Sequence, residues 1–372
     1  MIVRFAPKTE FTRTIQRRVA AHLAAQDHRL IRRRMLAKTA IILAWTVTSY
    51  VALVFFADGG WTTFFASTSL GLALAGVGFA IQHDANHGAY PVGKRARRAL
   101  GFCLDLMGGS SYLWRFQHNV NHHTFTNVVG GDNDICIGGI ARLSPLQPRR
   151  SVHRFQHIYL WPLYSLLAVS WMYWADWRDY VRGAIGENAF PRPSKREKWL
   201  FWGGKGIWVG LAFVLPMTLH SWSTVLLVGL WTYLVLGFVL SVVFQLAHVV
   251  DEVVFPDIRS ECPRSESEFF MHQIATTADF APDRRLLNWY LGGLNFQIEH
   301  HLFPRVCHLH YPALAPIVRQ VCEEFGVKHF TYPTLSSALA GHFRWLRTMG
   351  QSEASVPSPV AADGSAPSAA GG

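Results

Sequence analysis

The chain has 372 residues, of which 50% are hydrophobic and 16% are charged, and its mean hydropathy is +0.14. It is too apolar for a disordered protein, and five cysteines without a CxxC pair support neither a disulfide scaffold nor a zinc knuckle. Lys and Arg outnumber Asp and Glu by 35 to 24. No basic-aromatic nucleic-acid module accompanies this surplus, so we do not expect a nucleic-acid partner. The apolar composition together with the basic surplus indicates an integral membrane protein.

Four apolar stretches are long enough to cross a bilayer, which takes about 20 residues. They cover approximately residues 39–57, 61–81, 199–219 and 224–247. Only residues 58–60 join the first two, and only residues 220–223 join the last two, so each pair predicts a helical hairpin. The sequence therefore predicts an all-α membrane protein with four transmembrane helices in two hairpins.

Basic residues predict how these helices are oriented. Residues 1–38 hold ten Lys and Arg, residues 83–198 hold fifteen and residues 248–372 hold nine, whereas the two short links hold none. Because cytoplasmic segments of membrane proteins carry the excess of Lys and Arg, we expect both termini and both large segments on the cytoplasmic side. The positive surplus then reflects topology and attraction to anionic membrane lipid.

These boundaries divide the chain into three parts. Residues 1–38 are expected to form a basic cytoplasmic arm, and residues 39–350 one membrane domain. The cytoplasmic helical cap of that domain is expected to comprise residues 83–198 and 248–350. Residues 351–372 are rich in Ala, Ser, Pro and Gly, so we expect a disordered tail.

A further apolar stretch, residues 158–174, is broken by Pro162 and rich in Trp and Tyr. If it crossed the membrane, the basic segment that follows it would lie outside the cell. Amphipathic aromatic side chains prefer the membrane interface, so we expect an interfacial or re-entrant helix here.

Eight of the 18 histidines are grouped at or beyond the predicted cytoplasmic ends of the spans. They lie in three short segments, which we call the first box (residues 83–87), the second box (118–123) and the third box (297–301), and at His248. The other ten, such as His22, His153, His220 and His342, carry no such pattern.

The spacing within the boxes predicts metal binding. His83 and His87 are four residues apart, as are His118 and His122, so each pair shares one face of a helix. Neutral imidazole is the commonest metal ligand among side chains and suits iron, copper, zinc and nickel. Because one metal seldom takes more than six ligands, eight converging imidazoles indicate two metals.

Several hydrolytic classes fit the sequence poorly. The chain contains no HExxH motif and no His/Cys set with a glutamate base, so zinc hydrolysis is disfavoured. A GxSxG elbow and a phosphate-binding P-loop are also absent from the sequence.

The histidine motifs closely resemble those of the membrane fatty acid desaturase family. HDANH, HNVNHH and GGLNFQIEHHLFP (residues 292–304) are similar to its three histidine boxes, in order and on either side of a membrane hairpin. The resemblance covers about residues 35–345. Gln297 stands where many relatives have histidine, which is similar to the front-end and bacterial linoleoyl-CoA desaturase-like branch.

The resemblance implies a di-iron centre and names its ligands. They would be His83, His87, His118, His122, His123, His248, His300 and His301. Gln297 occupies the place of a ligand, and direct coordination, contact through water and simple hydrogen bonding all remain open for it. Asp84 and Glu299 lie beside ligands and are expected to orient an imidazole by accepting its second N–H. Asp132 and Asp134 are weaker candidates for the same role.

The same resemblance implies O2-dependent insertion of a cis double bond into a fatty acyl chain carried by CoA or by a lipid. No HPGG haem motif is present in the chain, so electrons would come from a separate ferredoxin or cytochrome b5 with its reductase. Positioning the chain would require a narrow apolar tunnel. Its candidate lining residues, which are as compatible with ordinary packing, are Trp114, Phe116, Trp289, Tyr290 and Phe296.

Two other functions remain open at this stage. A related di-iron hydroxylase of lipids or alkanes would use the same ligands, because hydroxylation and desaturation share the first hydrogen abstraction. A metal transporter or sensor is more remote. Transport sites normally lie near the bilayer midplane, whereas these histidines lie beyond the helix ends.

Overall fold

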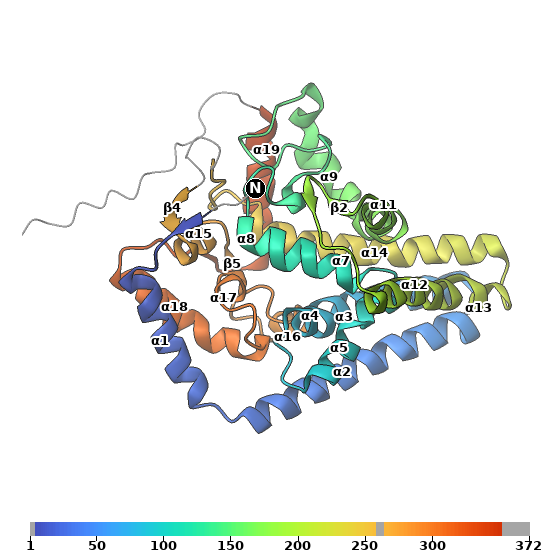
Figure 1. The fold of residues 1–372 in the computed structure, drawn as a ribbon. Coiled ribbons are helices and arrows are strands. Elements are labelled where there is room, and N and C mark those ends of the chain that lie inside the picture. Colours follow the sequence, from blue (N-terminus) through green and yellow to red (C-terminus); the bar gives the residue numbers. More distant parts are fainter. Residues whose placement is uncertain (1–3, 258–263, 352–372) are drawn as a thin grey trace, which may run out of the picture.

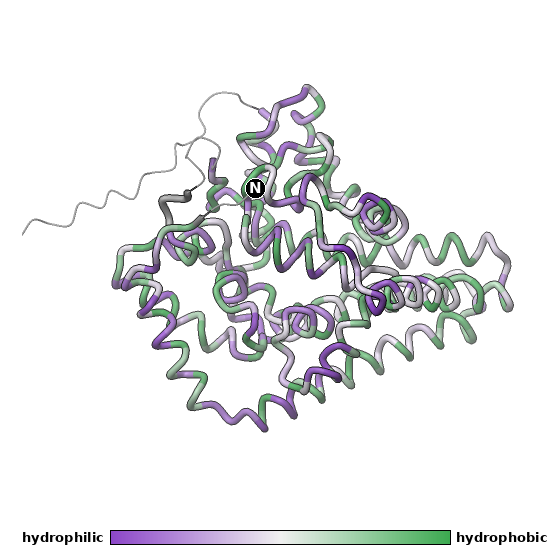
Figure 2. The backbone as a smooth tube through the Cα atoms, viewed as in Figure 1, coloured by the Kyte–Doolittle hydropathy of each residue, from purple (hydrophilic) through white to green (hydrophobic). Residues whose placement is uncertain are grey.

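The computed structural model describes residues 4–257 and 264–351, and these residues are mainly helical. Within them, four helices are long and apolar enough to cross a membrane: His28–Phe56, Gly60–His87, Lys195–Met217 and Trp222–His248. The helices extend side by side to one end of the molecule (Figure 1), and that end is predominantly hydrophobic (Figure 2). The predicted all-α fold with four membrane helices in two hairpins is confirmed.

Three of the four long helices contain a short stretch of wider, π-helical turn, whereas the fourth is an uninterrupted α-helix. The segments are α2 (His28–Val51) with η1 (Ala52–Phe56); α3 (Gly60–Val77) with η2 (Gly78–Gln82) and α4 (His83–His87); α12 (Lys195–Val209) with η7 (Gly210–Val214) and α13 (Leu215–Met217); and α14 (Trp222–His248). The helix of the first span begins eleven residues before the predicted start of that span. Asp27 caps it by accepting from the backbone N–H of Arg29 at 2.8 Å. An apolar run in the sequence identifies only the part of a helix that lies in the hydrocarbon core of the bilayer. The polar turns at the start of the helix are therefore not predicted from it.

Helix α3 packs between α2 and α14. Gly71 makes this approach close, because a Cβ atom at this position would meet the backbone oxygen of Thr232 and the side chain of Val235. Small residues commonly allow membrane helices to approach in this way.

The apolar stretch at 158–174 forms an interrupted helix that packs across α14. Its parts are α9 (Gln156–Tyr164), α10 (Leu166–Ser170), η6 (Trp171–Ala175) and α11 (Asp176–Arg182). The hydroxyl of Ser241 on α14 donates to the Tyr164 carbonyl at 3.0 Å. Lys205 on α12 forms a buried ion pair with Asp176, with 3.1 Å between Nζ and Oδ2. This segment is therefore joined by polar contacts to two membrane helices, α12 and α14.

The remaining elements form the cap. Its helices are α1 (Glu10–Ala24), α5 (Lys94–Gly101), α6 (Cys103–Leu106), α7 (Ser111–Phe116), η3 (Gln117–His122), α8 (His123–Phe125), η4 (Asn133–Ile135), η5 (Ser151–Phe155), α15 (Phe269–Ala275), α16 (Arg285–Tyr290), α17 (Gln297–Leu302), η8 (His308–His310), α18 (Tyr311–Glu324) and α19 (Leu335–Gln351). The described residues also form three two-stranded sheets, of which two join segments far apart in the sequence and one is a local hairpin. Their strands are β1 (Arg4–Ala6) with β4 (Arg264–Glu268), β2 (Ala184–Ile185) with β3 (Asn188–Ala189), and β5 (Asp279–Phe280) with β6 (Thr331–Tyr332).

The described part of the N-terminal segment packs on the cap. Phe11, Ile15 and Val19 recur every four residues on α1 and are buried in a core shared with α17 and α18. Arg18 adds an ion pair with Glu324 at 2.6 Å. The segment therefore forms a helix packed on the cap, and the boundary at residue 38 falls inside α2. The predicted disordered tail lies outside the described residues except for Gln351, which ends α19.

Candidate metal centre

The first box forms the C-terminal end of the long helix that begins at Gly60. His83 and His87 are the ends of α4, one turn apart, with ring centroids 4.6 Å apart. Gly88 stops the helix in a left-handed conformation, with φ of 82°. The predicted pairing of these two histidines on one helix face is present, and both side chains are buried.

The second box lies on a π-helical turn, η3, which runs from α7 into α8. A π-helix has a wider turn than an α-helix, so residues five apart come to face each other. The Nε2 atoms of His118 and His123 accordingly lie 3.2 Å apart. His122, four residues after His118, points instead toward His248 and His301, whose ring centroids lie 4.6 and 5.0 Å from its own.

The third box occupies α17, and its two adjacent histidines diverge. Successive helical residues point about 100° apart, because one turn holds 3.6 residues. His300 lies with its ring centroid 4.6 Å from that of His83. The ring centroid of His301 lies 4.8 Å from that of His248, which is the last residue of α14.

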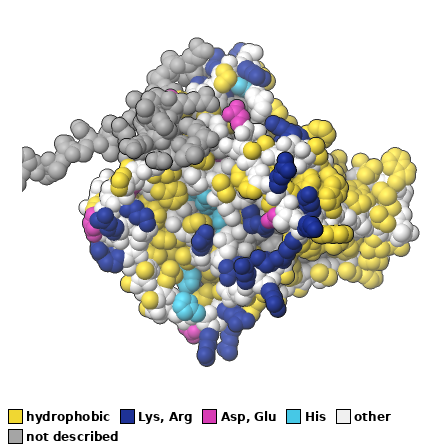
Figure 3. All heavy atoms as spheres, in the orientation of Figure 1, with side chains coloured by type: hydrophobic (Ala, Val, Ile, Leu, Met, Phe, Trp, Pro, Cys, Tyr) yellow, Lys and Arg dark blue, Asp and Glu magenta, His cyan; other side chains and the backbone are white. Residues whose placement is uncertain are grey.

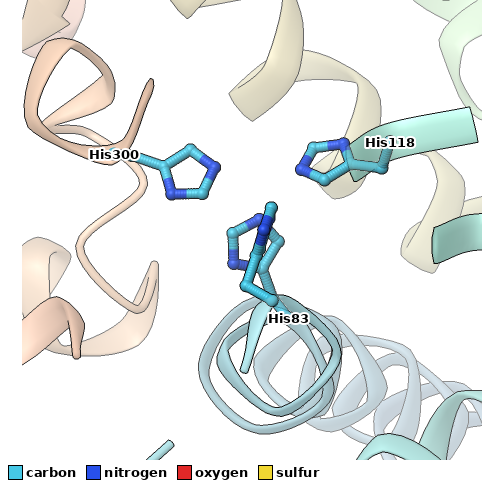
Figure 4. Close-up of side chains that lie close together, drawn as sticks. His83, His118 and His300 are labelled. Carbon is cyan, nitrogen blue, oxygen red and sulfur yellow. The ribbon is translucent and has the colours of Figure 1, made fainter. Parts of the chain in front are cut away.

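All eight predicted histidines converge at one end of the membrane helices. The first histidine group comprises His83, His87, His118 and His300, and the second comprises His122, His248 and His301. In each group the ligand atoms lie within 4.8 Å of one another, and His123 is similarly close to His300 and His301. Figure 4 shows His83, His118 and His300 pointing toward a common centre from three separate parts of the chain.

The rings are suited to bind metal. Burial, followed by the proximity of the other imidazoles, lowers the pKa of His118, His123, His300 and His301 well below the usual range. These rings are therefore neutral at physiological pH and retain the lone pair that a metal requires. Several ring nitrogens are buried without a hydrogen-bond partner, namely Nε2 of His83, His87, His248, His300 and His301. Buried polar atoms normally have partners, so these unpaired nitrogens fit a site that binds metal.

The opposite ring nitrogens have partners that fix the rings. His122 Nδ1 lies 3.1 Å from a carboxylate oxygen of Asp132. His301 Nδ1 lies 2.7 Å from the side-chain oxygen of Gln273. Burial opposes the charged form of His122, but the Asp132 carboxylate outweighs it and raises the pKa of that ring. Such contacts set the tautomer of metal-binding histidines. The prediction for Asp132 agrees with this geometry, whereas Gln273 has no sequence signal because it lies outside the boxes.

The three other predicted site residues occupy different surroundings. The side-chain oxygen of Gln297 is buried and has no hydrogen-bond partner among the described residues. The carboxylate of Asp84 faces His308, whose Nδ1 lies at 2.9 Å, and is 3.9 Å from His83 Nδ1. A carboxylate oxygen of Glu299 lies 3.6 Å from Nε2 of His329. Both carboxylates therefore have their nearest ring outside the set of eight histidines.

Asp84 belongs to a buried chain that the sequence analysis missed. Lys38 of α2 lies with its Nζ 2.8 Å from His308 Nε2, and His308 Nδ1 bonds to Asp84. Lys38 donates, so the neutral His308 bridges an ammonium and a carboxylate. This chain connects the first membrane helix to the first box and to the loop after the third box.

An apolar cavity of about 430 Å³ lies between the membrane helices. Its lining includes Leu74, Val77, Met107, Trp208, Val228 and Tyr233. Val77 is six residues before His83 on one continuous helix, so this end is about 9 Å along the helix axis from the first box. None of the five predicted tunnel residues lines this cavity. Trp114 instead stacks on His118, with ring centroids 4.4 Å apart.

The fold and the buried imidazoles define an integral membrane protein with a candidate metal centre at one end of its helices. Residues 59–333 match the family model described as fatty acid desaturase. The chain is 37% identical over 353 residues to the sn-1 linoleoyl-lipid 6-desaturase of Synechocystis sp., covering 94% of this chain and 98% of that protein. It is 38% identical to an acyl-lipid (8-3)-desaturase of Physcomitrium patens, covering 94% of this chain and 73% of that protein. The chain belongs to the fatty acid desaturase family and is a desaturase enzyme.

Proposed function

We propose that the protein is an O2-dependent acyl-lipid desaturase with two irons held by the eight histidines. The observation that carries this proposal is the convergence of eight buried imidazoles, seven of them in two groups and the eighth, His123, close to both. When bound, the irons supply the reduction of O2 to an oxidant that removes hydrogen from an unactivated methylene chain. The overall reaction converts –CH2–CH2– to –CH=CH–, consumes O2, two electrons and two protons, and releases two water molecules.

The histidines and Gln297 perform separate tasks in this proposal. The eight rings hold the irons, and Asp132 keeps the proton of His122 on the nitrogen that faces away from the group. The side-chain oxygen of Gln297 is buried and has no hydrogen-bond partner among the described residues, so Gln297 is the candidate for a ninth, weaker ligand. Trp114 covers the ring of His118 and excludes water from that side.

The substrate proposal rests on the relatives and on the cavity. The names of both relatives specify acyl chains that are linked to lipids. The cavity extends along α3 from Val77 to Thr63, which is about 21 Å at 1.5 Å per residue. An apolar acyl tail fits this space, with the bond to be oxidised placed near the histidine end. We propose lipid-linked acyl chains as substrates.

The distribution of charge supports a cytoplasmic active site. Lys and Arg gather over the wide end of the molecule, next to the protruding apolar part (Figure 3). Exposed examples are Arg32 and Arg33 at the start of α2 and Lys94 and Arg95 at the start of α5. By the positive-inside rule this end, with the histidines and both described ends of the chain, faces the cytoplasm. A basic surface also suits an acidic electron donor, either a ferredoxin or cytochrome b5 with its reductase.

Lipid profiling tests the proposed activity. The protein is expressed in a host that lacks it, and total fatty acids are compared by gas chromatography and mass spectrometry with a host expressing His301→Ala. A new double bond that depends on His301 and on O2 is expected. A hydroxylated product without new unsaturation would contradict desaturation and support the hydroxylase alternative.

A further inference from the structure

We propose that Gln273 is a positioning residue that fixes the proton of His301 and ties the second box to the third. This inference rests on the metal centre of the proposed function and deepens it. Gln273 lies on α15, outside every histidine box, and none of its surface is exposed.

The side-chain amide of Gln273 contacts three residues around the second histidine group. Its Oε1 atom lies 2.7 Å from His301 Nδ1 and 3.1 Å from Thr126 Oγ1. Its Nε2 atom donates to the backbone oxygen of His123 at 3.0 Å. The carbonyl of His123 can only accept, so it determines which end of the amide carries nitrogen and which carries oxygen.

This orientation determines the tautomer of His301. An amide oxygen can only accept, so His301 must carry its hydrogen on Nδ1. The Nε2 atom then keeps its lone pair, and it is buried without a partner and faces His122 and His248. Asp132 gives His122 the same tautomer through a carboxylate. An amide has no charge to lose, so the Gln273 contact is independent of pH.

Gln273 also sets the distance between two boxes. Its Nε2 atom donates to the main chain of His123 in the second box, and its Oε1 atom accepts from His301 in the third box. The Thr126 hydroxyl has one hydrogen to donate and lies nearer to the backbone oxygen of His122, at 2.8 Å, than to Gln273 Oε1, at 3.1 Å. One network therefore joins the main chain of the second box to a ring of the third box, more than 170 residues away in sequence. A ligand set built from separate segments needs such a connection to keep its geometry.

Metal titration of variants tests this inference. Gln273→Met keeps the size of the side chain and removes its hydrogen bonds, whereas Gln273→Glu keeps an oxygen facing His301. Gln156→Met is a matched control, because Gln156 is equally buried and links the Arg142 and Leu346 main chains away from the histidines. Purified metal-free proteins are titrated anaerobically with Fe²⁺ against a competing chelator, and bound metal is counted by mass spectrometry.

The wild type is expected to bind two irons, and Gln273→Met is expected to bind one of them roughly 10- to 100-fold more weakly. Gln156→Met should retain both. Gln273→Glu keeps the oxygen for His301 but loses the N–H for His123, so it should bind iron more tightly than Gln273→Met does. Unchanged affinity in Gln273→Met would overturn the inference. So would an equal loss in Gln156→Met, which would mean general destabilisation, or an equal loss in Gln273→Glu. A wild type that binds no metal would refute the proposed function itself.

Discussion

The Nε2 atoms of His118 and His123 lie 3.2 Å apart, although the two residues are five positions apart in the sequence. A π-helical turn brings them together, and both rings are buried and neutral. The adjacent His122 points away from this pair toward His301. One short segment therefore contributes to both histidine groups, so losing a ligand from either group should disable a shared centre.

Removal of a single ligand from the second group tests that interdependence. We expect His122→Ala and His301→Ala each to abolish the unsaturated product, because each removes one imidazole from the second histidine group. The protein should still be found in the membrane fraction, since neither residue lies on the apolar surface. His28→Ala, an exposed histidine at the start of α2, is the control and should keep activity. Full activity in either box variant would show that the ligand assignment is wrong.

Gln297 provides a second test. Gln297→His supplies a stronger ligand of similar reach, whereas Gln297→Ala removes the unpartnered oxygen altogether. We therefore expect the histidine variant to retain more product than the alanine variant, as measured by lipid profiling at equal protein level. Equal activity of Gln297→Ala and wild type would exclude a role for this side chain.

The outline of the fold and the grouping of the histidines could be predicted because both follow from local sequence patterns. Span length follows from apolar runs, and His83 with His87 follows from helical spacing. The division of the ligands could not be predicted, because His300 and His301 are adjacent and yet join different groups. Gln273 acts through a contact between distant segments, which leaves no local pattern. The start of α2 was placed too late because its first turns are polar.

The cavity predicts how acyl chain length is selected. Val228 lines the cavity, whereas the neighbouring Leu227 is 68% exposed on the outside of α14. Val228→Trp should fill part of the cavity and shift products toward shorter chains, because the tail has less room. Leu227→Trp adds the same bulk to the lipid-facing surface and should leave the product profile unchanged. Identical profiles for Val228→Trp and wild type would place the acyl tail elsewhere.

Glu299 predicts a pH dependence of stability. Burial raises the pKa of Glu299 to about 7 from its ordinary 4.5, and burial with the nearby Glu299 charge raises that of Asp279. At Glu299 the unfolded chain ionises at lower pH than the folded one, so the contribution of this residue to stability is full below pH 4.5 and falls as pH rises to about 7. For Glu299 this loss is on the order of 3 kcal/mol.

Thermal unfolding in detergent across this pH range measures the effect. Relative to the wild type, Glu299→Gln should gain stability as pH rises from 4.5 to 7, because a neutral amide has no ionisation to oppose. Glu323→Gln, which changes an exposed carboxylate on α18, should show no such gain. A stability difference between the wild type and Glu299→Gln that stays constant from pH 4.5 to 7 would contradict the raised pKa.

Anomalous X-ray scattering from crystals of the iron-loaded protein, recorded on either side of the iron absorption edge, tests the central claim most directly. The two histidine groups predict two iron peaks, one among His83, His87, His118 and His300 and the other among His122, His248 and His301. One peak, no peak, or peaks only outside these groups would contradict the two-iron centre.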